Sequence, residues 1–199
     1  MNLSQLDYHW FQVINHFAVT YSFFNPIMAF TANNLDYLFY IGVIIYWFTR
    51  TESNRQMVFQ GLVTASLALG TNKLIGTLYH RDRPFVHHHV IQLVMHEASA
   101  SFPSNHAAAS FAIAASIWFW RKRDGWIWFI LAAAISFSRV WSGIHYPTDV
   151  IGGAILGILL ALLVNRVFRS FHLFKRISET LIQFYENIEH RIWKPKNRV

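Results

Sequence analysis

Residues 150–168 read VIGGAILGILLALLVNRVF, and this stretch decides the fold class. A helix needs about 20 predominantly apolar residues to cross a membrane, with roughly 17–25 as the usual range. The stretch meets that length and carries no charge before Arg166. Residues 57–79 meet it as well. The sequence therefore predicts an all-α, integral-membrane helical bundle rather than an ordinary soluble domain.

The composition supports the same class. Hydrophobic residues make up 54% of the 199 residues and charged residues only 14%, whereas globular chains average about 25% charged residues. This composition excludes intrinsic disorder, which requires low hydrophobicity and high charge. The chain has no cysteine, which excludes disulfides, cysteine-ligated zinc and thiol nucleophiles.

Three further apolar stretches lie at about 37–49, 107–120 and 126–141, the first with a weaker lead-in from Phe23. The second and third are short, and each needs its polar flank to complete a helix that crosses the membrane. Residues 121–125 separate them, and we interpret this segment as a tight hairpin loop. Together with the two longer stretches, they predict five transmembrane helices.

Both ends of the chain are predicted to lie along the membrane. Residues 2–21 carry Asp7 among apolar and aromatic residues, which is typical of an amphipathic interfacial helix. If residues 10–31 instead cross the membrane, the number of spans becomes six. In the tail, 169–199, apolar residues recur at spacings of three and four, which predicts a cytoplasmic amphipathic helix. These residues are Phe174, Ile177, Leu181, Tyr185, Ile188 and Ile192.

The formal net charge of +7 does not gather on one basic face. Most Lys and Arg residues lie in segments 50–56, 121–125 and the tail after 166. These segments fall on one side of the predicted bundle, which the positive-inside rule places in the cytoplasm. The loops at 80–106 and 142–149 fall on the other, extracytoplasmic side. The distribution predicts a membrane partner and no nucleic acid.

The two extracytoplasmic loops hold most of the remaining polar chemistry. Its three elements are HRDRP at 80–84, SFPSNH at 101–106 and SRVWSGIHYPTD at 138–149. Charged groups at such depth are costly and are usually functional or paired. Ser104 precedes an Ala-rich helical run and suits the N-cap position. A helix that starts there would present free N–H groups to an anion.

His145 and Asp149 are separated by one helical turn that contains Pro147. Because proline is favoured in a first helical turn, Asp149 could reach one imidazole nitrogen of His145. That contact would fix the tautomer and leave the other nitrogen free to attack. His106 falls in the first turn after Ser104 and would point toward an anion bound there. An isolated His–Asp pair is more often structural, but two histidines and three arginines on one face indicate catalysis.

These elements resemble the motifs of the type-2 phosphatidic acid phosphatase superfamily: Lys-x6-Arg-Pro, Pro-Ser-x-His and Ser-Arg-x5-His-x3-Asp. The resemblance covers roughly residues 57–168 of a chain that we interpret as one domain, 1–199, and the latter two motifs match completely. The motif lysine falls on Gly76, but Lys73, one helical turn earlier, could reach the same phosphate. Within the superfamily, the chain resembles bacterial undecaprenyl-diphosphate phosphatases of the bacitracin-resistance kind, and the stretch Arg-Pro-Phe-Val at 83–86 supports this resemblance.

The resemblance implies a reaction and a role for each motif residue. His145 would attack the terminal phosphorus of undecaprenyl diphosphate to give a phosphohistidine, and Asp149 would orient it. His106 would protonate the leaving oxygen and then activate water. The products would be undecaprenyl phosphate and phosphate. The implied phosphate-binding residues are Arg83, Arg139, Ser104, Asn105 through its backbone N–H, Lys73 and, beyond the motif, Arg81.

Several alternatives stay open. No metal or other cofactor is implied, although His87-His88-His89 with His96 could be proposed as a metal site. The substrate could instead be phosphatidylglycerophosphate or phosphatidate, because the motifs are shared. A vanadate-dependent haloperoxidase is disfavoured by the predicted spans. A small transporter is disfavoured because the charges cluster at one face rather than at mid-membrane. The sequence does not indicate an oligomeric state.

Overall fold

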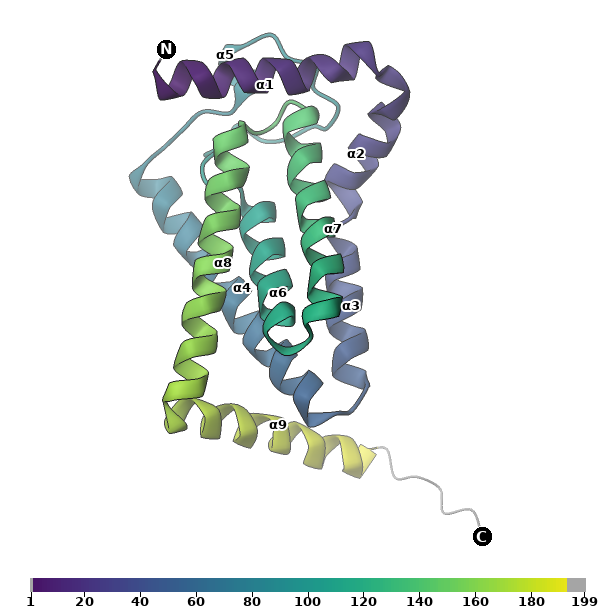
Figure 1. The fold of residues 1–199 in the computed structure, drawn as a ribbon, viewed down its shortest axis with the longest axis vertical. Helices are drawn as coiled ribbons and strands as arrows, with labels where there is room; N and C mark the ends of the chain where they lie inside the picture. The colour runs from purple at the N-terminus through teal and green to yellow at the C-terminus, as the bar shows by residue number, and fades with distance from the viewer. Residues whose placement is uncertain (1, 193–199) are drawn as a thin grey trace.

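The computed structural model describes residues 2–192, and every regular element in that range is a helix. Figure 1 shows an upright bundle between two transverse helices, α1 (Leu3–Thr20) at one end and α9 (His172–Ile192) at the other. The upright helices are α2 (Asn25–Asn34), α3 (Tyr37–Phe48), α4 (Glu52–Leu78), α6 (Asn105–Trp120), α7 (Lys122–Trp141) and α8 (Pro147–Ser170). The short helices are the 3-10 helix η1 (Ser22–Phe24) and α5 (Pro84–His87).

Helix α6 lies at the centre of the bundle and packs against α4, α7 and α8. Glycines in α8 allow the closest of these contacts. A Cβ atom added at Gly153 would lie 2.6 Å from the carbonyl oxygen of Ser104, and one at Gly157 would lie 2.3 Å from that of Ala108. Small residues commonly permit such close approach between helices in lipid. The α6–α8 crossing therefore holds the start of α6 against the start of α8.

The bundle buries polar and small side chains among its core residues and leaves many large apolar side chains on its outer surface. The buried polar residues of α4 include Asn54, Gln56, Gln60, Thr64 and Asn72. The exposed apolar residues include Ile44 and Ile45 of α3, Ile127 and Ile130 of α7, and Leu159 and Leu163 of α8. Monomeric soluble proteins rarely expose apolar surface over so many neighbouring elements. The pattern is typical of a bundle whose outer surface faces lipid.

The number of transmembrane helices stays a prediction. Among the described helices, α8 alone is by itself long and apolar enough to cross a membrane. The segments Ser22–Asn34 and Tyr37–Phe48 pass the same test together, across a bend of 49°. This bent pair covers the predicted 37–49 stretch and its lead-in. The alternative of one span over 10–31 is wrong, because α1 ends at Thr20 and the chain turns before α2.

The predicted hairpin loop at 121–125 is also wrong in its extent. Helix α6 ends at Trp120 and α7 begins at Lys122, so Arg121 alone connects them. Gly125 permits this tight connection, because a Cβ atom there would lie 2.5 Å from the Cα atom of Trp118. This connection lies at the same end of the bundle as the α3–α4 connection and α9 (Figure 1). The cation-rich segments are thus grouped at one end, as predicted.

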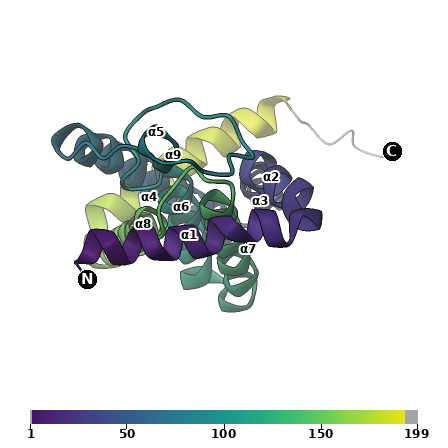
Figure 2. The same cartoon turned by 90° about the horizontal axis from the view of Figure 1, so that it is seen from above.

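The two predicted terminal helices are present and lie across the bundle axis. Helix α9 buries Ser178 and Ile182 against the bundle, and residues 193–199 of the predicted tail lie outside the described residues. Helix α1 packs on α7 and α8, and Figure 2 shows it crossing over their ends. It buries two polar residues, Asp7 and Asn15, which a helix resting only on the membrane interface would not do.

Candidate active site

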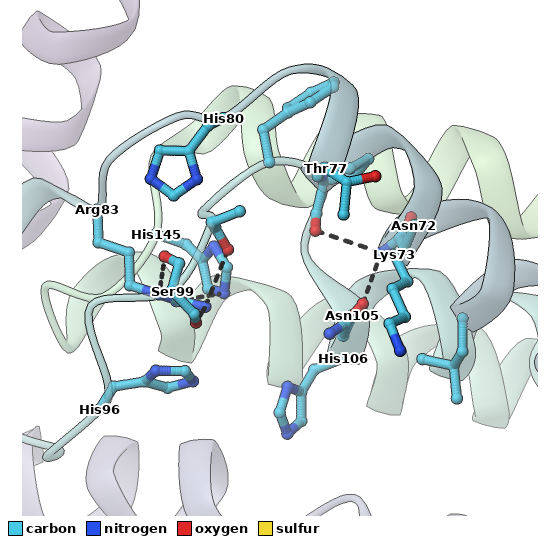
Figure 3. A pocket seen from close by; sticks show the side chains of 15 residues that line it. Asn72, Lys73, Thr77, His80, Arg83, His96, Ser99, Asn105, His106 and His145 are labelled. Atoms are coloured by element: carbon cyan, nitrogen blue, oxygen red, sulfur yellow. Dashed lines mark hydrogen bonds between the residues drawn. The ribbon is translucent and has the colours of Figure 1, made fainter.

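The loops at the α1 end enclose a cavity of about 630 Å³. Its walls come from the second half of α4, the segment between α5 and α6, the first turn of α6 and the α7–α8 connection. Figure 3 shows Arg83 and His96 on one side of this cavity and Lys73, Asn105 and His106 on the other. His145 also contributes to the lining. All three predicted motif elements therefore meet at one cavity.

A glycine in the α7–α8 connection shapes the turn that carries His145. Gly143 has a φ angle of 77°, which lies in the left-handed region that favours glycine. A Cβ atom at this position would lie 2.7 Å from the carbonyl oxygen of Ile91. The segment between α5 and α6 can therefore pack directly against this turn.

His145 is held at both of its ring nitrogens. The side chain is 2% exposed. Its Nδ1 lies 3.3 Å from Oδ2 of Asp149, and its Nε2 lies 3.0 Å from Nη1 of Arg83. Because a guanidinium can only donate, Nε2 accepts and the proton lies on Nδ1. The predicted contact between His145 and Asp149 is confirmed, and it leaves Nε2 as the unprotonated nitrogen beside Arg83.

Asp149 is completely buried in the first turn of α8, with both carboxylate oxygens bound. Oδ2 accepts hydrogen bonds from the Tyr146 N–H at 2.8 Å and from the Ser101 hydroxyl, in addition to its contact with His145. Oδ1 accepts a hydrogen bond of 2.8 Å from Nη1 of Arg81. The orientation of the carboxylate toward the imidazole is therefore fixed from several directions.

The electrostatics of the site favour a neutral imidazole beside a cation. Burial lowers the pKa of His145 to about 4, against the opposite effect of its contact with Asp149. The ring is therefore uncharged at pH 7, which is the nucleophilic form. Burial also lowers the pKa of Arg83 to about 10, so this guanidinium stays charged at pH 7. A neutral nucleophile beside a fixed cation suits attack on an anionic substrate.

The start of α6 provides unpaired polar groups. Ser104 occupies the predicted N-cap position, but its hydroxyl makes no capping bond, and within residues 2–192 its buried Oγ has no partner. The predicted N-cap position of Ser104 is therefore confirmed, although its side chain does not cap the helix. The backbone N–H of Ser104 instead donates to the carbonyl of Asp149 at 3.0 Å, which holds the chain in place and leaves the hydroxyl available.

Asn105 and Lys73 line the cavity from the side opposite Arg83. The Oδ1 of Asn105 accepts a hydrogen bond of 3.0 Å from Asn72, whose amide also donates to the Pro103 carbonyl at 3.2 Å. Asn72 thus ties α4 to the start of α6. Lys73 is exposed and lines the cavity wall, and the half-buried Gly76 lines it as well. The structure therefore brings the alternative lysine to the site.

His106 lines the cavity beside the α2–α3 connection, whereas Arg139 is not among the residues that line it. The Nε2 of His106 lies 3.9 Å from Oδ2 of Asp36, and its side chain is 33% exposed. Arg139 is buried at the end of α7, and its Nε has no hydrogen-bond partner in the described part of the chain. His106 is therefore available to a ligand in the cavity, and Arg139 retains a buried donor without a partner among the described residues.

Arg81 is a predicted phosphate ligand that does not line the cavity and whose guanidinium is already bound to other side chains. Its Nη1 donates to Oγ1 of Thr148 at 2.7 Å and to Asp149, and its Nη2 donates to Asp7 at 2.6 Å. Its guanidinium lies 4.0 Å from the centre of the Tyr146 ring. Because the terminal nitrogens are occupied behind Asp149, the structure contradicts the prediction that Arg81 binds the inner phosphate.

The loop histidines that could have formed a metal site are dispersed. His87 lies 2.8 Å from Asp82, and the ring of His88 stacks on that of Tyr8 at 4.0 Å. His96 faces the cavity instead, with its ring centre 6.5 Å from that of His145. Within residues 2–192, no three His, Asp or Glu side chains are grouped closely enough to hold a metal ion.

Four site residues were missed by sequence reasoning. Ser101 belongs to the quoted SFPSNH element, so its position next to Ser104 was an available signal. Asp7 is the single carboxylate of the amphipathic helix α1, which is a weaker signal. Asp36 and Asn72 have no local pattern that indicates their partners, because those partners lie far away along the chain.

Known proteins match this chain over the same region. The PAP2 superfamily model matches residues 57–172, which contain all three motif elements. The chain belongs to the PAP2 superfamily. Across the whole chain it is 37% identical to the Bacitracin transport permease protein BcrC of Bacillus licheniformis, of which it covers 96%. It is also 31% identical to the Undecaprenyl-diphosphatase BcrC of Bacillus subtilis strain 168. That alignment covers 95% of this chain and 96% of the relative.

Two solved structures share the fold. A PAP2-type phosphatidylglycerolphosphate phosphatase from Bacillus subtilis superposes with a TM-score of 0.62 at 26% identity, covering 86% of this chain and 89% of that one. LpxE of Aquifex aeolicus gives a TM-score of 0.64 at 24% identity, covering 81% and 95%. The predicted resemblance is therefore confirmed, and this PAP2 protein is a membrane lipid phosphate phosphatase.

Proposed function

We propose that this PAP2 enzyme hydrolyses undecaprenyl diphosphate to undecaprenyl phosphate and phosphate through a phosphohistidine at His145. The observation that carries the proposal is the pair of contacts made by the two ring nitrogens of His145 at the cavity wall. Its Nδ1 lies 3.3 Å from Asp149 and its Nε2 lies 3.0 Å from Arg83. This arrangement supports a neutral imidazole that attacks with Nε2, while the cation attracts the phosphoryl oxygens.

The first step transfers the phosphoryl group to the enzyme. Nε2 of His145 attacks the terminal phosphorus, a nitrogen–phosphorus bond forms, and the bond from phosphorus to the bridging oxygen breaks. Asp149 stabilises the charge that develops on the imidazole, and His106 donates a proton to the oxygen of the leaving undecaprenyl phosphate.

The second step returns the enzyme to its starting state. His106, now unprotonated, accepts a proton from water while the water oxygen attacks the phosphorus. The nitrogen–phosphorus bond breaks, and phosphate leaves. Positive charge and N–H groups hold the phosphoryl oxygens in both steps, which is the larger part of catalysis in phosphoryl transfer. These groups are Arg83, Arg139, Lys73, the Ser104 hydroxyl and the backbone N–H of Asn105.

A smaller cavity beside the first supports a lipid substrate. It has a volume of about 160 Å³ and includes Leu69, Asn105 and His106, which also line the larger cavity. Its apolar lining comes from α3 and α6 and includes Phe39 and Ile113. A diphosphate in the larger cavity could therefore extend its hydrocarbon chain between α3, α4 and α6.

The relatives favour a polyprenyl diphosphate over a glycerophospholipid. The two BcrC proteins align with essentially the whole chain, at 37% and 31% identity. Phosphatidylglycerophosphatase B of Bacillus subtilis aligns with 63% of it, at 31% identity. A diphosphate also carries more negative charge than a monophosphate, which suits the several cations around the cavity. Hydrolysis of phosphatidylglycerophosphate or phosphatidate is the alternative that the assay must separate.

Phosphate release by the purified protein in detergent tests the substrate. The panel contains undecaprenyl diphosphate, phosphatidylglycerophosphate and phosphatidate at equal mole fractions, each with and without EDTA. We expect the highest kcat/KM with undecaprenyl diphosphate and no loss with EDTA. Much faster release from either glycerophospholipid would retain the phosphohistidine chemistry and overturn the substrate.

Bacitracin resistance tests whether the enzyme acts in cells as a phosphatase or as a transporter. We expect expression of the wild-type chain to raise resistance, because removing the diphosphate removes the lipid that bacitracin sequesters. His145→Ala, expressed to the same level, should give no resistance. Resistance that persists in His145→Ala would favour a transporter and contradict the proposal.

The positive-inside rule also supports an extracytoplasmic active site. Ser53 and Met95 are exposed at opposite ends of the bundle, and the chain has no native cysteine. In intact cells, an impermeant thiol reagent should label Met95→Cys and spare Ser53→Cys. The reverse labelling would place the active site in the cytoplasm.

A further inference from the structure

Helix α1 carries a single carboxylate, Asp7, whose side chain is 2% exposed. Asp7 faces the first turn of α8. Its Oδ1 accepts a hydrogen bond of 2.9 Å from the Thr148 N–H, and its Oδ2 accepts one of 2.6 Å from the Thr148 hydroxyl. Its Oδ2 also accepts a hydrogen bond of 2.6 Å from Arg81. Asp7 therefore has a complete set of partners around the residue that precedes Asp149.

Arg81 connects Asp7 to the carboxylate that holds the nucleophile. One terminal nitrogen donates to Asp7 and the other donates to Oδ1 of Asp149 at 2.8 Å. Oδ2 of Asp149 in turn lies 3.3 Å from Nδ1 of His145. Asp149 is fully buried, and Arg81 is 22% exposed. A continuous path of charged hydrogen bonds thus leads from α1 to the imidazole.

Asp7 sets the direction in which Arg81 donates to Asp149. A guanidinium presents its donors in a rigid plane, so the partner of one terminal nitrogen fixes the direction of the other. With Asp7 in place, Arg81 is directed to Oδ1 of Asp149, and Oδ2 stays available to His145. Without the second carboxylate, Arg81 would be free to turn and compete with the imidazole for Asp149.

We propose that Asp7 is a positioning residue of the active site, which acts through Arg81 to orient Asp149 and His145. The rate of phosphoryl transfer then depends on the carboxylate that α1 contributes to this path, and not on the attachment of α1 alone. The inference rests on the proposed role of His145 but not on the identity of the lipid. Because Asp7 does not line the substrate cavity, its loss should lower kcat and leave KM nearly unchanged.

The same helix offers a matched control in Asn15, which is 6% exposed. Its amide donates to the carbonyls of Trp141 at 2.8 Å and Ile91 at 2.9 Å, and its Oδ1 accepts from the Ile91 N–H at 2.9 Å. Asn15 therefore fastens α1 to the bundle through neutral hydrogen bonds. It has no contact with Arg81 or Asp149, so its loss weakens the seating of α1 without removing a charge from the path.

The test compares Asp7→Asn, Asp7→Glu and Asn15→Ala in the purified full chain, with the lipid phosphate that the wild type hydrolyses fastest. We expect Asp7→Asn to lower kcat about tenfold, the size of coupling through a network of this kind, with KM within about twofold of wild type. Asp7→Glu should recover part of the rate. Asn15→Ala should lower Tm at least as much as Asp7→Asn while retaining most of kcat.

A double variant separates positioning from mere destabilisation. If Asp7 acts through Arg81, then Asp7→Asn combined with Arg81→Leu should be no slower than Arg81→Leu alone, since coupled residues are not additive. Wild-type kcat in Asp7→Asn, or equal kcat losses in Asp7→Asn and Asn15→Ala, would overturn the inference. If Asp7→Asn fails to fold, the Arg81→Lys variant replaces it. A wild-type kcat in that variant would overturn the inference equally. A preference for a glycerophospholipid would overturn the proposed substrate only.

Discussion

The α1 and α9 ends of the bundle each contain an arginine that is held between two carboxylates. At the α9 end, Arg55 donates hydrogen bonds of 2.5 Å to Glu186 and to Glu189, and its guanidinium lies 5.3 Å from the Tyr185 ring. Arg55 is 2% exposed. This arrangement fastens the transverse helix α9 to α4.

At the α1 end, Arg81 is held between Asp7 and Asp149 in the same manner. The two ends differ in what the carboxylates contact besides the arginine. Asp149 contacts His145, whereas Glu186 and Glu189 contact no imidazole within the described residues. The same pairing of charges attaches a transverse helix at each end, and in the proposed mechanism the pairing at the α1 end also orients the nucleophile.

The largest difference in kcat between the two ends should follow from neutralising one carboxylate at each end. Asp149→Asn should lower kcat by about 10⁴-fold, as for other buried aspartates that hold a catalytic imidazole. Glu189→Gln, which makes the same chemical change at the α9 end, should leave kcat within about twofold. Phosphate release by the two purified variants measures both values. Equal losses would show that the two ends do not differ in the proposed way.

Replacing the two arginines should give a smaller and more selective difference. Arg81→Leu and Arg55→Leu each leave two carboxylates without their shared cation, so both should lower Tm in detergent. Arg81→Leu should also lower kcat by about tenfold or more, because Asp149 loses its orienting partner. Arg55→Leu should retain kcat at temperatures below its Tm. A large kcat loss in Arg55→Leu would mean that attachment of α9 controls the active site.

The smallest effect should come from exposed lysines at the two ends. Lys73 lines the cavity at the α1 end, and on α9 the Nζ of Lys175 lies 3.7 Å from Oε1 of Glu179. Lys73→Ala should raise KM by about two- to fivefold, the range for one solvent-exposed charge interaction. Lys175→Ala should leave KM unchanged. An unchanged KM in Lys73→Ala would show that Lys73 does not replace the lysine that the superfamily motif has at Gly76.

The parts of the site that follow from local pattern were predictable. The spacing of His145 and Asp149 within one turn after Gly143 indicated their contact, and the apolar stretch 150–168 indicated α8. Arg83 and His106 likewise belong to short motifs whose spacing carries the information. In these cases the interacting groups are close in sequence or are placed by one helix start.

The remaining parts depend on contacts that no local pattern encodes. The bond between Asp7 and Thr148 joins residues 141 positions apart. Arg81 and Arg83 stand two residues apart in a segment without regular structure, so their spacing does not tell which one faces the cavity. The bend between α2 and α3, which brings Asp36 to His106, is likewise set by tertiary packing.

The central claim is that His145 carries the phosphoryl group during turnover. The direct measurement is trapping by a denaturing quench at alkaline pH, with a lipid diphosphate labelled with ³²P at the terminal phosphorus, followed by peptide mapping under alkaline conditions. His106→Ala should slow hydrolysis of the intermediate and accumulate label that is stable to base, labile to acid and located at residue 145. His145→Ala should carry no label. Label at another residue, or turnover in His145→Ala, would contradict the account.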